Sequence, residues 1–587
     1  MKKILTSVET VVPDMCNGIV LAHPELELLP KYKVIKKRAL NKDKVTLISG
    51  GGSGHEPAHA GFIGKGLLDA AVCGDVFASP SQIQVYQAIK ATESNKGTLL
   101  IIKNYSGDMM NFQNAAYLAA EDGIQVDYVK VDDDVAVEDS LYTVGRRGVA
   151  GTVFVHKIAG AAAEQGKSLA EVKALAERAA AKVRTIGFAL TSCTVPAKGS
   201  PTFSLEENEM EYGVGIHGEP GIRRESIIDA HELAGRMIGS LCNDLHIKTN
   251  NGGRVALLIN GFGATPLMEL YLLNKEVSAE LGMRGVTLVR TFVGNFMTSI
   301  DMSGASVSLL DLDGEAELEA LLNEACEAPG LKISGPVEAI KPQNTFFASA
   351  EETTHSATAE LPAEYASIGE SFTLENMLHV IDRMSDSIIR NEVPFCELDS
   401  HAGDGDFGMS VAKGFRQLKA EWPSIISREA LTIGDFLNEC SMVIMEHCGG
   451  ASGPIWGSAF RSAAKSTEGK TRLSVADFAA MLHAAVGGIQ SIGERSFGRG
   501  AVVGDKTLID ALVPCAEAWS SAAENGSSFT VAFTAGAVAA VDGAKSTESI
   551  VARMGRAGTV GARSIGYPDA GAHALGIIFT DIANTLK

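Results

Sequence analysis

Residues 1–335 contain repeated short apolar runs that are rich in β-branched residues and end in glycine, asparagine or aspartate. Such runs predict strands, and alanine-rich stretches with the composition of helices separate several of them. The runs cover residues 45–52, 98–107, 126–134, 185–192, 254–263 and 285–294, and the longest alanine-rich stretch covers 159–185. Strands that alternate with helices predict an α/β domain with mixed sheets, in which ligands bind where strands end.

The pattern changes twice further along the chain. Residues 336–368 are rich in Pro, Thr, Ser, Ala and Glu without a period, which predicts an extended linker. After it, residues 373–390, 433–448, 475–489 and 529–544 have a helical character, and no comparable strand pattern follows. We therefore expect an α/β domain over 1–335, a linker over 336–368 and an all-α domain over 369–587.

Composition limits the classes of partner. A formal net charge of −20 disfavours non-specific binding to nucleic acid or to anionic membranes. No apolar run reaches the roughly 18 residues of a membrane span or forms the core of a signal peptide, so we expect a cytoplasmic protein. The nine cysteines are scattered and never spaced as CxxC, which argues against a disulfide framework and a zinc knuckle.

Two segments of the first domain could hold a small oxygenated ligand. Residues 48–66, ISGGGSGHEPAHAGFIGKG, are predicted to follow a strand and open a helix, and they include the titratable pair His55 and Glu56. Residues 101–112 end a predicted strand with Lys103, Tyr105 and Asp108. The alternative is ordinary turn and capping chemistry, in which His55 is a turn residue and Asp108 caps the next helix.

One further histidine stands between glycines. His217 lies in GIHGEPG, residues 215–221, and no second His or Cys is at metal-ligand spacing from it. A metal site is therefore disfavoured. The spacing leaves open whether His217 contacts a ligand or is a polar turn residue.

The second domain carries an acidic cluster. Asp399, Asp404 and Asp406 lie within ELDSHAGDGDFG, residues 397–408, and the intervening glycines allow the three carboxylates to converge. Few, hard oxygen ligands suit Mg²⁺ with a phosphate partner, and the alternative is a solvated acidic loop. Glycine-rich loops at 447–457 and 561–573 could bind anions through backbone N–H groups, although neither is a Walker loop.

The segments SGGGSGHEP, KNYSGDMMNF, GVGIHGEPGI, LDSHAGDGDFG, GGASGP and RSIGYPDAG together resemble the dihydroxyacetone kinase family in its single-chain, ATP-dependent form. The resemblance covers nearly the whole chain in the family's order. It implies that the first domain binds a short ketose and that His217 adds to the ketose carbonyl to form a covalent hemiaminal. It further implies acid/base roles for His55 and Asp108 and substrate contacts from Gly52, Ser53, Gly54 and Lys103.

For the second domain, the resemblance implies a helical barrel in which Asp399, Asp404 and Asp406 hold two Mg²⁺ ions that bind the phosphates of ATP. The implied nucleotide-binding residues are Phe407, Gly408, Met409, Ser410, Ala451, Ser452, Gly498, Leu508, Arg556, Asp569, Ala570 and Gly571. Many family members carry histidine at the position of Phe407. The family precedent is also a homodimer, often with kinase domains exchanged between chains.

We therefore expect an ATP- and Mg²⁺-dependent kinase that phosphorylates dihydroxyacetone, and also glyceraldehyde, at a primary hydroxyl. The alternatives are a kinase for a longer ketose such as erythrulose, a side activity that cleaves FAD to cyclic FMN, and a ligand-sensing regulator without enzymatic activity.

Overall fold

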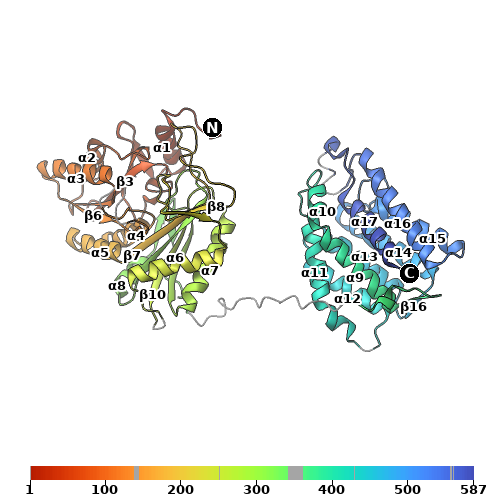
Figure 1. Ribbon diagram of the computed structural model, residues 1–587. Helices are drawn as coiled ribbons and strands as arrows, with labels where there is room; N and C mark the ends of the chain where they lie inside the picture. Colours follow the sequence, from red (N-terminus) through yellow and green to blue (C-terminus); the bar gives the residue numbers. More distant parts are fainter. Residues whose placement is uncertain are drawn as a thin grey trace. The chain divides into compact units, whose positions relative to one another are not determined.

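The computed structural model describes residues 2–137, 145–249, 252–341, 361–428, 430–554, 558 and 561–587. The chain divides into two compact units, residues 1–350 and 351–587. The first is built of sheets and helices and the second almost wholly of helices (Figure 1). The predicted fold class is confirmed.

The first unit contains two mixed six-stranded sheets. The first has the order β1-β2-β4-β3-β5-β6, in which β4, β3, β5 and β6 are mutually parallel. Its strands are β1 (Leu26–Leu29), β2 (Val34–Lys37), β3 (Thr46–Ser53), β4 (Ala70–Val76), β5 (Thr98–Lys103) and β6 (Val126–Val131). The second has the order β11-β10-β12-β7-β8-β9, and in it only β10 and β11 pair in parallel. Its strands are β7 (Val183–Ala189), β8 (Glu209–Tyr212), β9 (Arg223–Ser226), β10 (Arg254–Gly261), β11 (Thr287–Gly294) and β12 (Gly304–Asp311).

Helices cover the two sheets and fill the space between them. Helices α2 (Gln82–Ala91) and α3 (Ser106–Glu121) pack on one face of the first sheet, and α6 (Ala230–Leu245) and α7 (Leu267–Met283) pack on one face of the second. Helix α4 (Thr152–Glu164) is buried over nearly its whole length. The remaining elements of the unit are α1 (Val11–Ala22), α5 (Leu169–Lys182), α8 (Ala316–Asn323) and a hairpin of β13 (Cys326–Ala328) and β14 (Leu331–Ile333).

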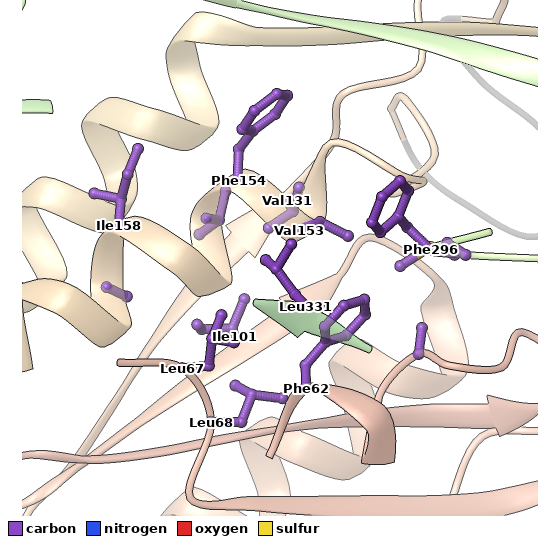
Figure 2. Close-up of a cluster of buried hydrophobic side chains, with 14 of the residues drawn as sticks. Phe62, Leu67, Leu68, Ile101, Val131, Val153, Phe154, Ile158, Phe296 and Leu331 are labelled. Atoms are coloured by element: carbon purple, nitrogen blue, oxygen red, sulfur yellow. The ribbon is translucent and has the colours of Figure 1, made fainter. Parts of the chain in front are cut away.

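The main core of the first unit forms around α4. Figure 2 shows Val153, Phe154 and Ile158 of α4 beside Ile101 of β5 and Val131 of β6. The same core includes buried residues of the second sheet. Apolar burial of this extent ties both sheets to one helix, so the strand ends of the two sheets have fixed positions relative to each other.

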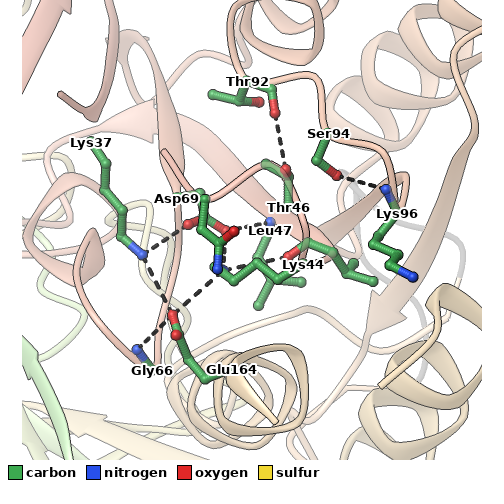
Figure 3. Close-up of polar contacts among 12 residues, drawn as sticks. Lys37, Lys44, Thr46, Leu47, Gly66, Asp69, Thr92, Ser94, Lys96 and Glu164 are labelled. Carbon is green, nitrogen blue, oxygen red and sulfur yellow. Dashed lines mark hydrogen bonds and ion pairs between the residues drawn. The ribbon is translucent and has the colours of Figure 1, made fainter. Parts of the chain in front are cut away.

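A buried ionic network fixes the amino-terminal ends of β3 and β4. Asp69 accepts from Lys37 at 2.8 Å, from Lys44 at 2.9 Å and from the Leu47 N–H at 2.9 Å (Figure 3). Glu164 of α4 lies 3.5 Å from Lys44. The two lysines hold the pKa of Asp69 below its usual value despite burial. Two cations and a backbone donor compensate for the desolvation of this carboxylate.

The second unit is a closed ring of helices. Helices α9, α11, α12, α13, α14, α15, α16 and α17 pack on one another in this order, and α17 returns to α9. The helices are α9 (Leu374–Arg390), α10 (Glu392–Asp399), α11 (Phe407–Ile426), α12 (Ile433–His447), α13 (Ser452–Ser466), α14 (Val475–Phe497), α15 (Ile509–Glu524), α16 (Phe529–Ser546) and α17 (Ala570–Thr585). Thr373, Thr432 and Ser474 begin α9, α12 and α14 with capping boxes, which explains where these helices start.

Helix α14 is the one helix in the described part of the chain that is long and apolar enough to cross a membrane. It packs between α13 and α15 and buries Phe478 and Leu482 in the helical core. This is the position of a core helix, which explains its composition without a membrane.

Two local expectations were wrong. Residues 48–66 do not open a helix: the glycine run is the end of strand β3, and only the short 3₁₀ helix Ala60–Phe62 follows. The stretch 159–185 is interrupted between α4 and α5 and ends inside β7. The prediction of an all-α second domain is confirmed, with one two-residue strand pair, Phe372–Thr373 with Arg472–Leu473, as a local addition. The linker expected over 336–368 lies partly outside the described residues, and residues 366 and 368 bond to the C-terminal Lys587.

Candidate active site

The first candidate site lies at the carboxyl ends of β3 and β5, beside a turn that follows β8 of the other sheet. His55 follows β3, Lys103 ends β5 and Asp108 is in the first turn of α3. The turn at 215–221 brings His217 to within 3.3 Å of His55, measured between the two Nε2 atoms. The structure thus brings together side chains from four segments of the sequence.

The two imidazoles are held in defined tautomers. The Nδ1 atom of His55 lies 2.8 Å from the carbonyl oxygen of Thr298, which can only accept, so Nδ1 of neutral His55 carries the proton. Nε2 of His55 then has a free lone pair and accepts from Nε2–H of His217. Burial lowers the pKa of both imidazoles well below the ordinary value, so both are neutral at physiological pH.

Aromatic rings surround this histidine pair. Phe77 stacks on His55 at 5.1 Å between ring centroids and meets His217 edge-on at 5.3 Å. Tyr105 meets His217 edge-on at 4.5 Å. These contacts restrict the rotation of both imidazoles and exclude water from their faces. Phe77 has a φ of 57°, which is unusual for an aromatic residue and places its ring over the site.

Lys103 and Asp108 form a buried polar pair behind the histidines. They are 0% and 3% exposed, and Lys103 Nζ and Asp108 Oδ1 have no hydrogen-bond partner in the described part of the chain. Burial raises the pKa of Asp108 and lowers that of Lys103, and each charge partly offsets the other shift. Buried polar atoms without partners are costly, so these two groups are suited to bind the hydroxyl or carbonyl oxygens of a small ligand.

The glycines before His55 serve close packing. A Cβ atom on Gly52 would lie 2.8 Å from the backbone of Phe77, and one on Gly54 would lie 2.8 Å from the Phe77 ring. One on Gly51 would lie 3.1 Å from Lys103 Nζ. Ser53 donates its hydroxyl to the carbonyl of Gly74 at 2.7 Å. The glycine run therefore lets Phe77 and Lys103 approach the ligand site.

An ionic clamp fixes the turn that carries His217. Glu219 accepts from the His217 N–H at 2.9 Å and from Arg147 at 2.9 Å, and Arg147 also pairs with buried Asp134 at 2.6 Å. Gly218 has a φ of 71°, and a Cβ atom there would lie 2.4 Å from Sγ of Cys193. Gly218 is thus required by the backbone conformation and by packing, and the imidazole of His217 is pre-positioned.

The second candidate site is the acidic loop at 399–406. Asp399, Asp404 and Asp406 offer ligand atoms that all lie within 4.8 Å of one another. Asp399 also accepts from the Gly405 N–H at 2.9 Å, and Gly405 has a φ of 75°. Three carboxylates at this separation repel one another without a cation, and they fit the oxygen preference of Mg²⁺.

The residues expected to bind nucleotide lie at helix ends. Gly408, Met409 and Ser410 are in the first turn of α11, Ala451 and Ser452 begin α13, Leu508 precedes α15, and Asp569, Ala570 and Gly571 begin α17. Gly498 ends α14 just before the loop to α15. Ser410 donates to the Gly449 carbonyl at 2.7 Å, and a Cβ atom on Gly571 would lie 3.1 Å from Leu508. These contacts join neighbouring loops at one end of the barrel, where helix N-termini favour anions.

Three of these residues need separate comment. Arg556 lies outside the described residues. The ring centroid of Phe407 lies 6.0 Å from that of Phe395, and Phe407 packs against the helical core, so the side chain at this position makes an apolar contact. Asp569 is half-buried, and desolvation raises its pKa to about 7.

Sequence reasoning missed several residues that shape the first site. No local sequence pattern marks Phe77 or Thr298 as a site residue. Phe77 follows β4, a strand that was not predicted, and Thr298 lies in the loop between β11 and β12. Glu219 stands within GIHGEPG and could have been noticed, but its partner Arg147 is far away in the sequence.

Comparison with known proteins covers both units. A Dak1 domain matches residues 17–330 and a DAK2 domain matches residues 401–584. A dihydroxyacetone-binding subunit DhaK of a PTS-dependent dihydroxyacetone kinase from Listeria innocua is 50% identical over 55% of this chain and 97% of that protein. Triokinase/FMN cyclase of Mus musculus is 34% identical over 100% of this chain and 99% of that protein. L-Erythrulose 1-kinase of Mycolicibacterium smegmatis is 34% identical over 100% of both.

Two solved structures are also similar. Dihydroxyacetone kinase of C. freundii in complex with AMP-PNP and Mg²⁺ is 30% identical, with a TM-score of 0.58 over 99% of both chains. The dihydroxyacetone kinase operon co-activator DhaQ is 37% identical, with a TM-score of 0.52, but it covers 54% of this chain and 97% of its own. The kinase thus matches both units, whereas the co-activator matches about half of the chain.

The full-length matches, together with the buried polar site of one unit and the acidic loop of the other, confirm the family expected from the sequence: the chain belongs to the dihydroxyacetone kinase family and is an ATP-dependent kinase.

Proposed function

We propose that this kinase phosphorylates dihydroxyacetone to dihydroxyacetone phosphate, and also accepts glyceraldehyde, with the ketose held as a hemiaminal on His217. The observation that carries the proposal is the arrangement of His55 and His217, whose Nε2 atoms are 3.3 Å apart while Nδ1 of His55 is tied to a carbonyl. Two neutral imidazoles in this arrangement suit addition to a ketone.

The addition step balances without an external acid or base. Nε2 of His217 forms a bond to the carbonyl carbon, and its proton passes through Nε2 of His55 to the carbonyl oxygen, which becomes the hemiaminal hydroxyl. The site carries the same net charge before and after the addition, and His55 is cationic only while it passes the proton on, in keeping with the low pKa of both imidazoles. Glycerol has no carbonyl, so this anchor discriminates by chemistry that glycerol cannot undergo.

Asp108 is the proposed base for the reacting hydroxyl. Its buried carboxylate has a raised pKa, which brings it closer to that of a useful base at neutral pH. Lys103 is placed to bind a substrate oxygen, because its ammonium lacks a hydrogen-bond partner in the described part of the chain. The backbone at Gly52, Ser53 and Gly54 completes the proposed substrate contacts.

For the nucleotide, Asp399, Asp404 and Asp406 would hold two Mg²⁺ ions, which when bound neutralise the phosphate charge during transfer. The N–H groups at the starts of α11, α13 and α17 would bind phosphate oxygens. Arg556, Gly498 and Leu508 are proposed nucleotide contacts on the family resemblance.

Intact-mass measurement after incubation with dihydroxyacetone tests the anchor. We expect a single adduct that is absent from His217→Ala and present in His231→Ala, a control at an exposed histidine. An adduct that persists in His217→Ala would refute the assignment.

The similarity to L-erythrulose 1-kinase and to triokinase/FMN cyclase favours two further candidates, a longer-ketose kinase and a second activity that cleaves FAD. A panel of short ketoses and aldoses with ATP, read by ADP release, and a separate incubation with FAD separate them. The substrate with the highest kcat/KM identifies the ketose, and cyclic FMN in the FAD incubation identifies the second activity.

A further inference from the structure

Lys506 is a buried cation surrounded by backbone carbonyls. It is 2% exposed and has a φ of 62°. Its Nζ atom donates to the carbonyls of Thr547 at 2.8 Å, Tyr567 at 2.8 Å and Ile550 at 3.3 Å, and also to that of Ser564. Four carbonyls around one ammonium resemble the coordination of a small monovalent ion, and they compensate for the water that it has lost.

These carbonyls come from both ends of the segment that connects α16 to α17. Thr547 and Ile550 begin the segment, and Ser564 and Tyr567 stand just before Asp569. The hydroxyl of Thr547 accepts from the Asp569 N–H at 2.8 Å, so the two ends are also joined directly. Lys506 therefore holds the start of α17 in place from the loop before α15.

The turn around Lys506 is itself rigid. Asp510 accepts from the N–H of Gly504 at 2.6 Å and from that of Thr507 at 2.8 Å. This carboxylate fixes the backbone on both sides of Lys506, which offsets the unfavourable φ of the lysine. The ammonium is consequently presented in one position.

Tyr567 extends the connection to the acidic loop. Its ring stacks on that of His401 at 3.7 Å between centroids and with an interplanar angle of 8°. His401 stands between Asp399 and Asp404 in the sequence, and Tyr567 is 44% exposed. Because both rings are exposed, their contact lies outside the hydrophobic core. Its effect is to connect the loop that carries Tyr567 with the loop that carries His401.

We infer that Lys506 is a positioning residue for the nucleotide: through the Tyr567 carbonyl and the stack of Tyr567 on His401, it fixes the loop that carries Asp569 against the acidic loop at 399–406. The inference rests on the proposed nucleotide contacts at 569–571. It assigns a function to a lysine that touches neither substrate nor metal ligand.

Direct binding of AMP-PNP with Mg²⁺, measured by calorimetry on the full chain, tests this. Lys506→Met and Tyr567→Leu are expected to weaken binding by roughly tenfold or more and to raise KM for ATP, because a loosely held loop must be ordered on binding. KM for the ketose and the His217 adduct should not change. Tyr567→Phe, which keeps the ring, should retain the affinity that Tyr567→Leu loses, and Lys545→Met is a control at an exposed lysine.

Two outcomes would overturn the inference, and they distinguish its failure from a failure of the proposed nucleotide contacts at 569–571. Wild-type affinity in Lys506→Met and Tyr567→Leu, with loss of affinity in Asp569→Asn, refutes the positioning role alone. Wild-type affinity in all three variants refutes the nucleotide contacts at 569–571 as well. Because Tyr567 is exposed, Tyr567→Leu remains informative even where Lys506→Met does not fold.

Discussion

Formation of the His217 adduct should be almost insensitive to mild acid. Burial is the largest cause of the lowered pKa of both His55 and His217, and it acts by penalising the cationic form. The neutral forms that the addition step needs therefore persist below the pH at which an ordinary histidine takes up a proton.

The expected loss of adduct at low pH depends on two groups, because both His55 and His217 must be neutral. An imidazole with an ordinary pKa of about 6.5 is about one-tenth neutral at pH 5.5. A site that needs two such neutral groups would lose about a hundredfold of its competent form between pH 7.5 and 5.5. With both pKa values well below 6.5, we expect a much smaller loss than this hundredfold.

The assay is carbon NMR of dihydroxyacetone labelled at the carbonyl carbon, titrated with protein at pH 7.5, 6.5 and 5.5. The ketone and hemiaminal carbons differ in hybridisation and give separate signals. Circular dichroism at each pH checks folding, because buried neutral histidines regain an ordinary pKa on unfolding and cost up to about 1.4 kcal/mol of stability per pH unit and per histidine below pH 6.5. A hundredfold loss of adduct in folded protein would refute the neutral-pair mechanism.

Three further predictions follow from the geometry. Asp404→Ala or Asp406→Ala should lower kcat by about a thousandfold or more while leaving the ketose adduct intact, because only charge stabilisation in phosphoryl transfer is lost. Rapid-quench kinetics and intact-mass measurement test this, and loss of the adduct as well would contradict separate roles for the acidic loop and the histidine site. Asp69→Asn should destabilise the first unit by about 3–5 kcal/mol in urea unfolding, because Lys37 and Lys44 lose their shared carboxylate, whereas Asp43→Asn at an exposed position should not. Gly218→Ala should abolish the adduct through contact with Cys193, whereas Gly199→Ala, with a similar φ of 69° and nothing within 4 Å, should cost only backbone strain; equal effects of the two would refute the packing argument.

The division into an α/β part and a helical part could be predicted because periodicity is a local property. The six apolar runs that were expected to be strands correspond to β3, β5, β6, β7, β10 and β11. Strand β12 was missed, although its residues Ser306 and Ser308 alternate with buried apolar ones, because this buried strand carries polar side chains that bond across the sheet. Strand β4 was missed because its residues, such as Ala70 and Gly74, are small.

The site could be predicted only in part. His55, Lys103, Asp108 and His217 stand in glycine-rich strand ends, which sequence reasoning can recognise. The Nε2 separation of the two histidines depends on how the two sheets pack around α4, and no local pattern specifies that. The prediction of a helix after the glycine run was wrong. Those glycines are needed for close packing against Phe77 and Lys103, which are distant in the sequence.

The close packing around the glycine run has a consequence for how this pocket could evolve. Gly50 faces Val72 of strand β4, Gly51 faces Lys103, and Gly52 and Gly54 both face Phe77, so a side chain added at any of them meets a close neighbour. A change of preferred sugar length is therefore expected from substitution of the rings that contact His217, Phe77 and Tyr105, and not from the glycines. The glycine run would then stay fixed while the surrounding rings vary.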